Sequence, residues 1–385
     1  MTIHEPLVDG DGAVRPTHVL VDHTRLATNF RRICDHVQRP VLPILKANAY
    51  GHGVVAVAHT MVAAGASMVG VAYLEEGILL RRAGISCDIL VLGGILGSQV
   101  PTFLRHELVL SASSVDKVLA IEAAAAEMGR VARVHLKIDT GMERFGVHWY
   151  NAFRLIEAAM SAPHVRVEGV YSHLSASEDA DTTALQLERF LGAVSWWADR
   201  GLPTPTRHLA NSGAILGQPS TWLDLVRPGL LLYGVAPSPQ LPVLPGILPA
   251  LTWISRVVYF KVVPAGAVVS YGGRWTAQRQ TRLVTVPVGY GDGYLRAMSG
   301  RAEVGIGGRR YPVVGTICMD SVVVDIGDDS AYNGDEVLLL GERGGCTLGA
   351  EELAEWAGTV PWEVLTAINT RVPRLAVGTP GTEAV

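Results

Sequence analysis

Short apolar runs alternate with helical patterns over roughly the first 240 residues, and this alternation constrains the fold more than any other feature. Eight runs read as buried strands, at residues 41–46, 68–73, 88–93, 107–112, 134–139, 168–174, 206–211 and 224–229. Between them, apolar residues recur at spacings of three and four, and glycine follows the last turn, which predicts helices. Eight such units favour an α/β fold, a closed (β/α)8 TIM-type barrel, with an open doubly wound sheet as the alternative.

The pattern changes near residue 248, where alternating apolar runs replace the long helical segments. Gly307-Gly308 lies between two such runs and predicts a hairpin turn. We therefore predict two domains, a barrel over residues 18–245 and a mostly β domain over residues 246–385. The strand expected near residues 18–22 can join either domain, so its pairing with the C-terminal domain is left open.

Composition and charge exclude several classes of partner. Hydrophobic residues make up 49% of the chain and charged residues 18%, which is typical of a soluble globular protein. The net charge of -4 offers no basic field for nucleic acid or anionic lipid. The four cysteines are widely spaced without a CxxC pair, which favours a reducing compartment. Since we also find no signal-peptide pattern and no uninterrupted apolar span, we expect a cytoplasmic protein without membrane contacts.

Polar residues gather at the ends of the predicted strands, where the catalytic groups of a (β/α)8 barrel lie. They are Lys46, Lys137, Asp139, His173, Asn211, Ser212, Arg227 and Gly229. Any one of them alone is more often structural than functional. Their joint placement at one edge of the barrel is what predicts a site.

Seven motifs carry these residues in order. They are KANAYGHG (46–53), KIDTGMERFG (137–146), YSHLSASED (171–179), ANSGA (210–214), VRPGLLLYG (226–234), GYGDGY (289–294) and GTICMD (315–320). Together they resemble the alanine racemases over nearly the whole chain. The resemblance implies a barrel with a C-terminal β domain, the cofactor pyridoxal 5'-phosphate (PLP), no metal, and interconversion of L- and D-alanine for peptidoglycan.

By this resemblance, Lys46 forms the Schiff base with the PLP aldehyde. A dry barrel mouth suits that role, because desolvation lowers the pKa of an amine and leaves it both nucleophilic and basic. The remaining cofactor-binding residues implied are Tyr50, Arg144, His173, Asn211, Ser212, Arg227 and the backbone of Gly229 and Leu230. Among them, Arg227 faces the pyridine nitrogen. A guanidinium only donates hydrogen bonds, so the ring stays largely unprotonated and side reactions such as transamination are discouraged.

Racemisation requires proton transfer on both faces of one carbon, and the resemblance assigns the second face to Tyr290 of the partner subunit. The implied assembly is a head-to-tail homodimer with shared active sites. The implied substrate-binding residues are Arg144, Met319 and Asp320. Lys137 matches a lysine that is often carbamylated in the family.

Three alternatives remain open. A racemase for serine or a broader set of amino acids is kept because Thr370 stands where many relatives carry a tyrosine at the entrance. A decarboxylase of the same architecture pairs the ring nitrogen with a carboxylate, so Arg227 argues against it. A non-catalytic PLP-carrying barrel lacks a C-terminal domain with a residue such as Tyr290.

Overall fold

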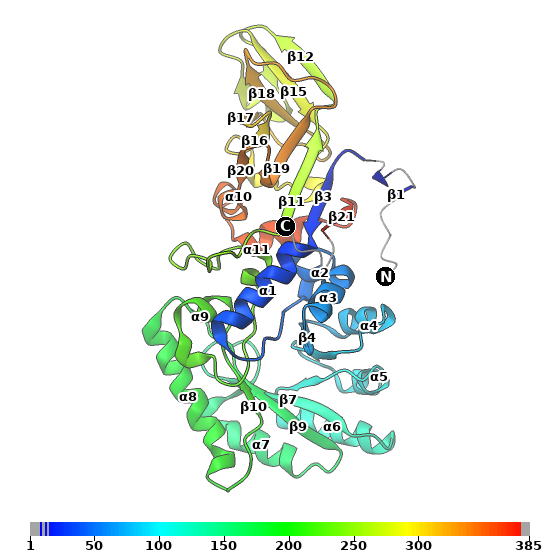
Figure 1. The fold of residues 1–385 in the computed structure, drawn as a ribbon, viewed down its shortest axis with the longest axis vertical. Helices are drawn as coiled ribbons and strands as arrows, with labels where there is room; N and C mark the ends of the chain where they lie inside the picture. Colours follow the sequence, from blue (N-terminus) through cyan, green and yellow to red (C-terminus); the bar gives the residue numbers. More distant parts are fainter. Residues whose placement is uncertain (1–7, 10–11, 14, 379–385) are drawn as a thin grey trace. The chain divides into compact units, whose positions relative to one another are not determined.

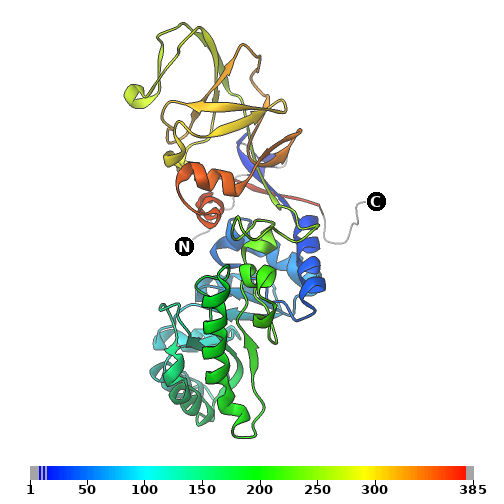
Figure 2. The same cartoon turned by 90° about the vertical axis from the view of Figure 1, so that its left-hand side faces the viewer.

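The computed structural model describes residues 8–9, 12–13 and 15–378, and the chain forms two compact units. One, the barrel unit, consists of Leu26–Ala49 and Val54–Ile247. The other, the β unit, consists of the described residues up to Arg25, Tyr50–Gly53 and the described residues from Leu248 onward. Figures 1 and 2 show the course of the chain through both units. None of the helices in the described residues combines the length and apolar character of a membrane span.

Parallel strands close into a ring in the barrel unit. The strands are β4 (Met68–Val71), β5 (Asp88–Val91), β6 (Leu110–Ala112), β7 (Ala132–Asp139), β9 (Val165–Tyr171) and β10 (Thr206–His208). Parallel ladders join β4 to β5, β6 to β7, β7 to β9 and β9 to β10. Parallel bridges join the remaining neighbours: Leu90 to Val109, His208 to Leu225, Val226 to Val41, and Ile44 to Gly70. The circuit of eight segments confirms the predicted (β/α)8 barrel, and the open sheet is excluded.

Helices connect these strands (Figure 1). They are α1 (His23–Val37), which begins in the β unit, α3 (Val54–Ala63), α4 (Leu74–Arg82), α5 (Val100–Arg105), α6 (Val115–Glu127), α7 (Ala152–Met160), α8 (Ala180–Ala198) and α9 (Ser212–Gly217). Short elements add η1 (Gly97–Gln99), η2 (Trp149–Asn151), η3 (Pro219–Thr221), η4 (Leu230–Tyr233) and β8 (Val147–His148), which pairs with β7. Side chains cap two of the longer helices, since Ser114 accepts from an N–H of α6 and Asp179 from an N–H of α8.

The β unit is built on one long sheet. Its strands are β3 (His18–Asp22), β11 (Leu251–Arg256), β12 (Tyr259–Val263), β15 (Thr281–Val286), β16 (Glu303–Ile306), β17 (Arg309–Val314), β18 (Val322–Gly327), β19 (Glu336–Arg343), β20 (Cys346–Leu348) and β21 (Arg374–Val377). Their order is β12-β15-β18-β17-β16-β19-β11-β3-β21, with β20 paired to β19. Gly307 and Gly308 form the β16–β17 turn with φ of 57° and 79°, which confirms the predicted hairpin.

Smaller elements complete the β unit. They are the strand pairs β1 (Val8–Asp9) with β2 (Gly12–Ala13) and β13 (Val268–Val269) with β14 (Trp275–Thr276), the helices α10 (Ala350–Ala357) and α11 (Pro361–Ala367), and the turns η5 (Tyr271–Gly273), η6 (Tyr290–Asp292) and η7 (Arg296–Met298).

The strand at residues 18–22 lies in the sheet of the β unit. It pairs antiparallel with β11 and parallel with β21. Its alternating pattern places Val19 and Val21 in the core, where both are almost fully buried. The β unit therefore draws on both ends of the chain.

Candidate active site

Lys46 begins α2 (Lys46–Tyr50), and this single turn is left-handed. Ala47, Asn48, Ala49 and Tyr50 have φ of 53°, 56°, 53° and 52°. Such a conformation costs L-residues about 1–2 kcal/mol each, and asparagine is the only one of the four that adopts it readily. The surrounding structure must therefore hold the turn in place.

Glu76, in the first turn of α4, supplies part of that support. One carboxylate oxygen accepts a hydrogen bond from the N–H of Ala47 at 2.7 Å. The other oxygen accepts from Ala72 at 2.7 Å and Tyr73 at 3.2 Å. A single carboxylate thus joins the residue after Lys46 to the start of a neighbouring helix.

Asn48 fixes the far side of the turn. Its side-chain oxygen accepts a hydrogen bond from the N–H of Val54, the first residue of α3, at 2.9 Å. The asparagine therefore fulfils two needs of the turn, a left-handed backbone and an acceptor for an unpaired helix N–H.

The Lys46 amine lies in a cationic and desolvated setting. Burial, and then the Arg144 guanidinium, lower the pKa of Lys46, while Glu76 opposes them. A larger share of the side chain is then the free amine near neutral pH, which is the form that attacks carbonyl carbon and accepts protons.

Arg227 is 4% exposed and follows the eighth strand segment. Nη1 donates to Nδ1 of His208 at 3.0 Å, and Nη2 donates to the carbonyls of Ser172 at 2.7 Å and Leu209 at 3.1 Å. Nη2 also lies 3.4 Å from Nδ1 of His173. Within the described part of the chain, its Nε–H has no acceptor. Burial lowers the pKa of Arg227 to about 10, so the group remains a charged donor at neutral pH.

Two histidines continue this network into the barrel core. Because arginine only donates, Nδ1 of His208 is the acceptor, and its Nε2–H donates to Nδ1 of His135 at 2.8 Å. Burial lowers the pKa of His135 to about 4 and that of His208 well below its ordinary value. Burial and the Arg227 charge also lower the pKa of His173. All three imidazoles are therefore neutral, and the direction of the hydrogen bonds is fixed.

Lys137 projects from β7 and is almost fully buried. Its Nζ lies 4.8 Å from the centroid of the Tyr171 ring. Burial, together with the Arg227 and Arg144 charges, lowers the pKa of Lys137 well below its ordinary value, against the opposing effect of Asp139. No ion pair of Lys137 is found among the residues that the structure describes.

Asp139, at the end of β7, organises the loop that carries Arg144. Its carboxylate accepts from the N–H groups of Gly141 at 2.8 Å, Met142 at 2.9 Å and Arg144 at 3.2 Å. Although burial opposes ionisation, these hydrogen bonds lower the pKa of Asp139. Both carboxylate oxygens of Asp139 thus accept hydrogen bonds from the loop backbone, and one of these bonds holds the main chain of Arg144 in place.

Ser212 and Asn211 open α9. Asn211 accepts from the N–H of Ala214 at 3.1 Å and caps the helix. The Ser212 hydroxyl accepts from the N–H groups of Gly229 at 2.9 Å and Leu231 at 3.2 Å. Because both lone pairs of the Ser212 oxygen accept hydrogen bonds, the hydroxyl still has its proton to donate. This hydroxyl lies close to the first residues of η4.

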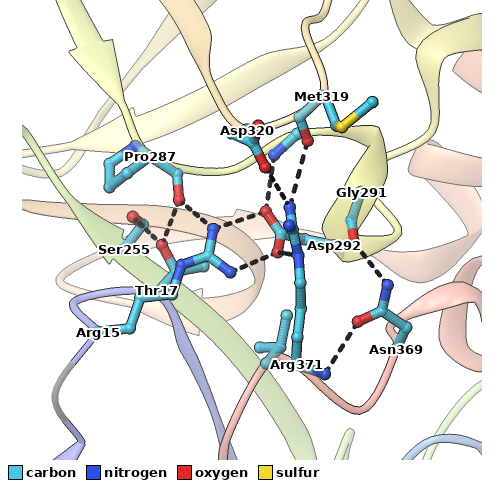
Figure 3. A network of polar contacts seen from close by, with 12 residues as sticks. Arg15, Thr17, Ser255, Pro287, Gly291, Asp292, Met319, Asp320, Asn369 and Arg371 are labelled. Carbon is cyan, nitrogen blue, oxygen red and sulfur yellow. Dashed lines mark hydrogen bonds and ion pairs between the residues drawn. The ribbon is translucent and has the colours of Figure 1, made fainter.

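Tyr290, Met319 and Asp320 lie together in the β unit (Figure 3 labels the latter two). The N–H of Tyr290 donates to the carbonyl of Cys318 at 3.0 Å, and that of Gly291 to the carbonyl of Met319 at 2.9 Å. Tyr290 is 41% exposed and Met319 52%. The segment around Tyr290 and the segment around Met319 are thus joined by backbone hydrogen bonds, although they lie nearly 30 residues apart in the sequence.

The site residues therefore fall into two groups. The barrel unit contains Lys46, Lys137, Arg144, His173, Asn211, Ser212, Arg227, Gly229 and Leu230. The β unit contains Tyr50, Tyr290, Met319, Asp320 and Thr370. Tyr50 is almost fully buried, and burial raises its pKa. Thr370 is exposed between α11 and β21.

Two family models match successive parts of the chain. Residues 21–237 match the model of the alanine racemase N-terminal domain, and residues 250–376 match that of the alanine racemase C-terminal domain. The chain belongs to the alanine racemase family.

The chain aligns with other members of this family over nearly its whole length and nearly all of theirs. The alanine racemase of Symbiobacterium thermophilum is 41% identical over 96% of this chain and 99% of its own. That of Carboxydothermus hydrogenoformans is 40% identical over 94% and 100%. The crystal structure of the alanine racemase from Streptomyces lavendulae superposes with a TM-score of 0.91 at 36% identity, over 95% of this chain and 98% of its own. The chain is accordingly an amino-acid racemase, an isomerase.

Sequence reasoning missed four residues that the site geometry uses. Glu76 supports the turn after Lys46, Asp292 lies in the Tyr290 turn itself, and Arg15 and Arg371 bind Asp292 (Figure 3). The only sequence signal for Asp292 was its place inside GYGDGY.

Proposed function

We propose that the chain is a PLP-dependent alanine racemase, in which Lys46 and Tyr290 of the partner subunit exchange protons with opposite faces of the substrate α-carbon. One observation carries the proposal: a lysine with a lowered pKa shares the barrel unit with a buried arginine that retains an unused donor. The relatives are named alanine racemases, and the structure of the Bacillus anthracis relative contains bound L-Ala-P.

The donors and the amine in the barrel unit fit PLP. The Ser212 hydroxyl retains its proton for a phosphate oxygen, and the backbone N–H of Leu230 is a further donor that we assign to it. We also assign to it the N–H of Gly229, which would have to be shared with Ser212, and the hydroxyl of Tyr50, a residue of the β unit. The Nε–H of Arg227 suits an unprotonated ring nitrogen, and the Lys46 amine suits the aldehyde. When bound, PLP withdraws electrons from the amino acid and makes its α-proton acidic.

The chain's own residues then move the proton. The free amine of Lys46 accepts or returns it on one face of the α-carbon, and the Tyr290 hydroxyl does so on the other. Because Arg227 is a poor proton donor, it would bind the ring nitrogen without protonating it, and the electron pair left at the α-carbon would be less delocalised. The proton is thereby returned to carbon, as racemisation requires.

We assign the substrate carboxylate to Arg144 and to the backbone N–H of Met319, with Asp320 beside them. A guanidinium binds a carboxylate well because its planar donors match the two oxygens. Asp139 supports this role, since it holds the loop in which Arg144 lies.

We also propose that CO2 carbamylates Lys137. The reaction requires a neutral amine, and the pKa of Lys137 is lowered well below its ordinary value by burial and by the neighbouring Arg227 and Arg144 charges. The product is an anion, which those two cations would stabilise.

The assembly we propose is a head-to-tail homodimer in which each active site combines one barrel unit with the partner's β unit. We assign the enzyme to the cytoplasm, consistent with four free cysteines, and to the supply of D-alanine for peptidoglycan. A racemase of broader specificity is the second candidate, favoured by the short and exposed Thr370 at the position where many relatives carry tyrosine.

Two measurements test the proposal. Purified protein with PLP should racemise alanine faster than serine and the other common amino acids, and a preference for another amino acid would establish the second candidate. An equal mixture of Lys46→Ala and Tyr290→Phe chains should recover about a quarter of the wild-type activity, because half of the dimers contain one intact site. No recovery despite demonstrated subunit exchange would refute the shared site.

A further inference from the structure

Asp292 is a fully buried carboxylate two residues after Tyr290 (Figure 3). It pairs with both terminal nitrogens of Arg15, one of them at 2.7 Å, and accepts from Nε of Arg371 at 2.6 Å. It also accepts from the N–H of Gly289 at 3.0 Å. Two guanidinium groups from opposite ends of the chain thus meet on one acid beside the tyrosine.

Arg371 links this acid to the second loop. Its Nη2 donates to Oδ1 of Asp320 at 2.8 Å and to the carbonyl of Met319 at 3.3 Å. One guanidinium therefore joins Asp292 to the segment whose backbone we assign to the substrate carboxylate.

Asn369 fixes the turn from a third side. Its side-chain nitrogen donates to the carbonyl of Gly291 at 2.5 Å, and its backbone N–H donates to the carbonyl of Asp292 at 3.1 Å. The turn that holds Tyr290 is consequently tied at Gly289, Gly291 and Asp292.

Arg15 anchors the strand that leads into the turn. Its Nη2 donates to the carbonyl of Pro287 at 2.8 Å, and the Thr17 hydroxyl donates to the same carbonyl at 2.6 Å. The end of β15 and the turn after it are therefore held by the same guanidinium (Figure 3).

The side chains that form ion pairs around the Tyr290 turn are two cations and two anions. Arg15 and Arg371 face the carboxylates of Asp292 and Asp320. Burial opposes ionisation of Asp292, but the hydrogen bonds from Arg15, Arg371 and Gly289 lower its pKa below the ordinary value. Removing the charge would leave two partly exposed cations, Arg15 and Arg371, without the acid that joins them.

We infer that Asp292 is a positioning residue for racemisation, which with Arg15 and Arg371 sets the Tyr290 hydroxyl and the Met319 amide in their reactive places. This inference rests on the proposed role of Tyr290. The acid acts through the backbone on both sides of that tyrosine, and a displacement of about 1 Å at a reacting group costs on the order of 100-fold in rate.

The test compares Asp292→Asn with Tyr290→Phe and with the double variant. Asparagine keeps the size of the side chain but turns a donor toward the two guanidiniums. We expect kcat to fall roughly 10- to 100-fold in Asp292→Asn. The double variant should lose no more kcat than Tyr290→Phe alone, because the acid affects proton transfer through the tyrosine, whereas its effect on the Met319 amide should appear as a raised KM. Cofactor absorbance should be retained, since its proposed ligands lie mainly in the barrel unit.

Asp329→Asn is the matched control in the same unit. Asp329 also accepts from an arginine, Arg309, and from the Tyr311 hydroxyl, but it contacts neither the Tyr290 turn nor Met319. Its replacement should leave kcat unchanged. Hydrogen–deuterium exchange without cofactor should quicken at residues 289–293 and 318–321 in Asp292→Asn only.

The outcomes separate the two proposals. Wild-type kcat in Tyr290→Phe would refute the two-base function itself. A large loss in Tyr290→Phe with no loss in Asp292→Asn, or losses that multiply in the double variant, would overturn the positioning role. Should Asp292→Asn not fold, Arg371→Lys replaces it, because lysine keeps the charge but cannot bridge Asp292 and Asp320. The Arg371→Lys variant should likewise lose no further kcat when it is combined with Tyr290→Phe. Losses of kcat that multiply in that combination would overturn the inference.

Discussion

The carboxylate of Glu76 accepts a hydrogen bond from the backbone N–H of Ala47 at 2.7 Å, and Ala47 directly follows Lys46. The proposed catalytic lysine is therefore placed by a turn whose backbone is unfavourable and whose support comes from a different helix. The support for the backbone after Lys46 thus comes from a side chain that lies outside the motif containing the lysine.

Replacing Glu76 by alanine should destabilise the protein and weaken PLP binding. Three backbone N–H groups lose their acceptor, and because two are exposed and that of Ala72 is partly buried, the expected cost is about 1 kcal/mol. Glu75→Ala is the control, since Glu75 lies in the same first turn of α4 but is exposed. Urea unfolding and a PLP titration measure the two effects. Equal behaviour of the two variants would contradict the supporting role of Glu76.

The two glycines of YGHG should respond differently to alanine. Gly51 and Gly53 both have positive φ, 82° and 95°. A Cβ on Gly51 would lie 2.2 Å from the carbonyl oxygen of Leu365, whereas one on Gly53 would meet no described atom within 4 Å. Gly53→Ala should therefore cost only the left-handed conformation, about 1–2 kcal/mol, and Gly51→Ala clearly more. Unfolding midpoints that rank the variants in the opposite order would contradict the packing at Gly51.

Stability should fall in mild acid because His135 is buried and neutral. Its pKa is lowered from 6.5 to about 4, so the unfolded chain takes up the proton first as the pH falls below 6.5. The stabilisation is complete above pH 6.5 and decreases toward pH 4, by about 1.4 kcal/mol per pH unit for this group. His135→Asn keeps an acceptor for His208 and should show a shallower slope between pH 6.5 and 5 in urea unfolding. The exposed His148→Asn serves as control, and equal slopes in all three proteins would refute the assignment.

Carbamylation of Lys137 should be visible directly. Protein prepared in 13C-bicarbonate should give a carbamate carbon resonance in NMR spectra, because the lowered pKa of the buried amine increases its neutral fraction and two guanidiniums would stabilise the product. The signal should be absent from Lys137→Met and present in Lys261→Met, whose lysine is exposed on β12. A spectrum without the resonance in the wild-type protein would show that Lys137 remains an unmodified amine.

Local patterns predicted the barrel because each strand has its own apolar run and each helix its own periodicity. The left-handed turn at Ala47 to Tyr50 was not predictable in the same way. Alanine and tyrosine give no signal for positive φ, and the support from Glu76 comes from a helix about 30 residues later. Only the following glycines marked a tight turn.

The support around Tyr290 was hidden for a similar reason. Asp292 pairs with Arg15 and Arg371, which are 277 and 79 residues away in the sequence. No spacing rule connects an acid to partners at such distances, because only the folded sheet brings β15, the N-terminal segment and the segment before β21 together. The motifs identified the reactive residues, but the groups that place them became visible only in three dimensions.

The central claim is that Lys46 holds the cofactor covalently. Purified protein incubated with PLP should turn yellow, and borohydride reduction followed by proteolysis and mass spectrometry should find one pyridoxyl group, on the peptide that contains Lys46. A colourless protein, or a label on Lys137 or another lysine with none at Lys46, would contradict the account.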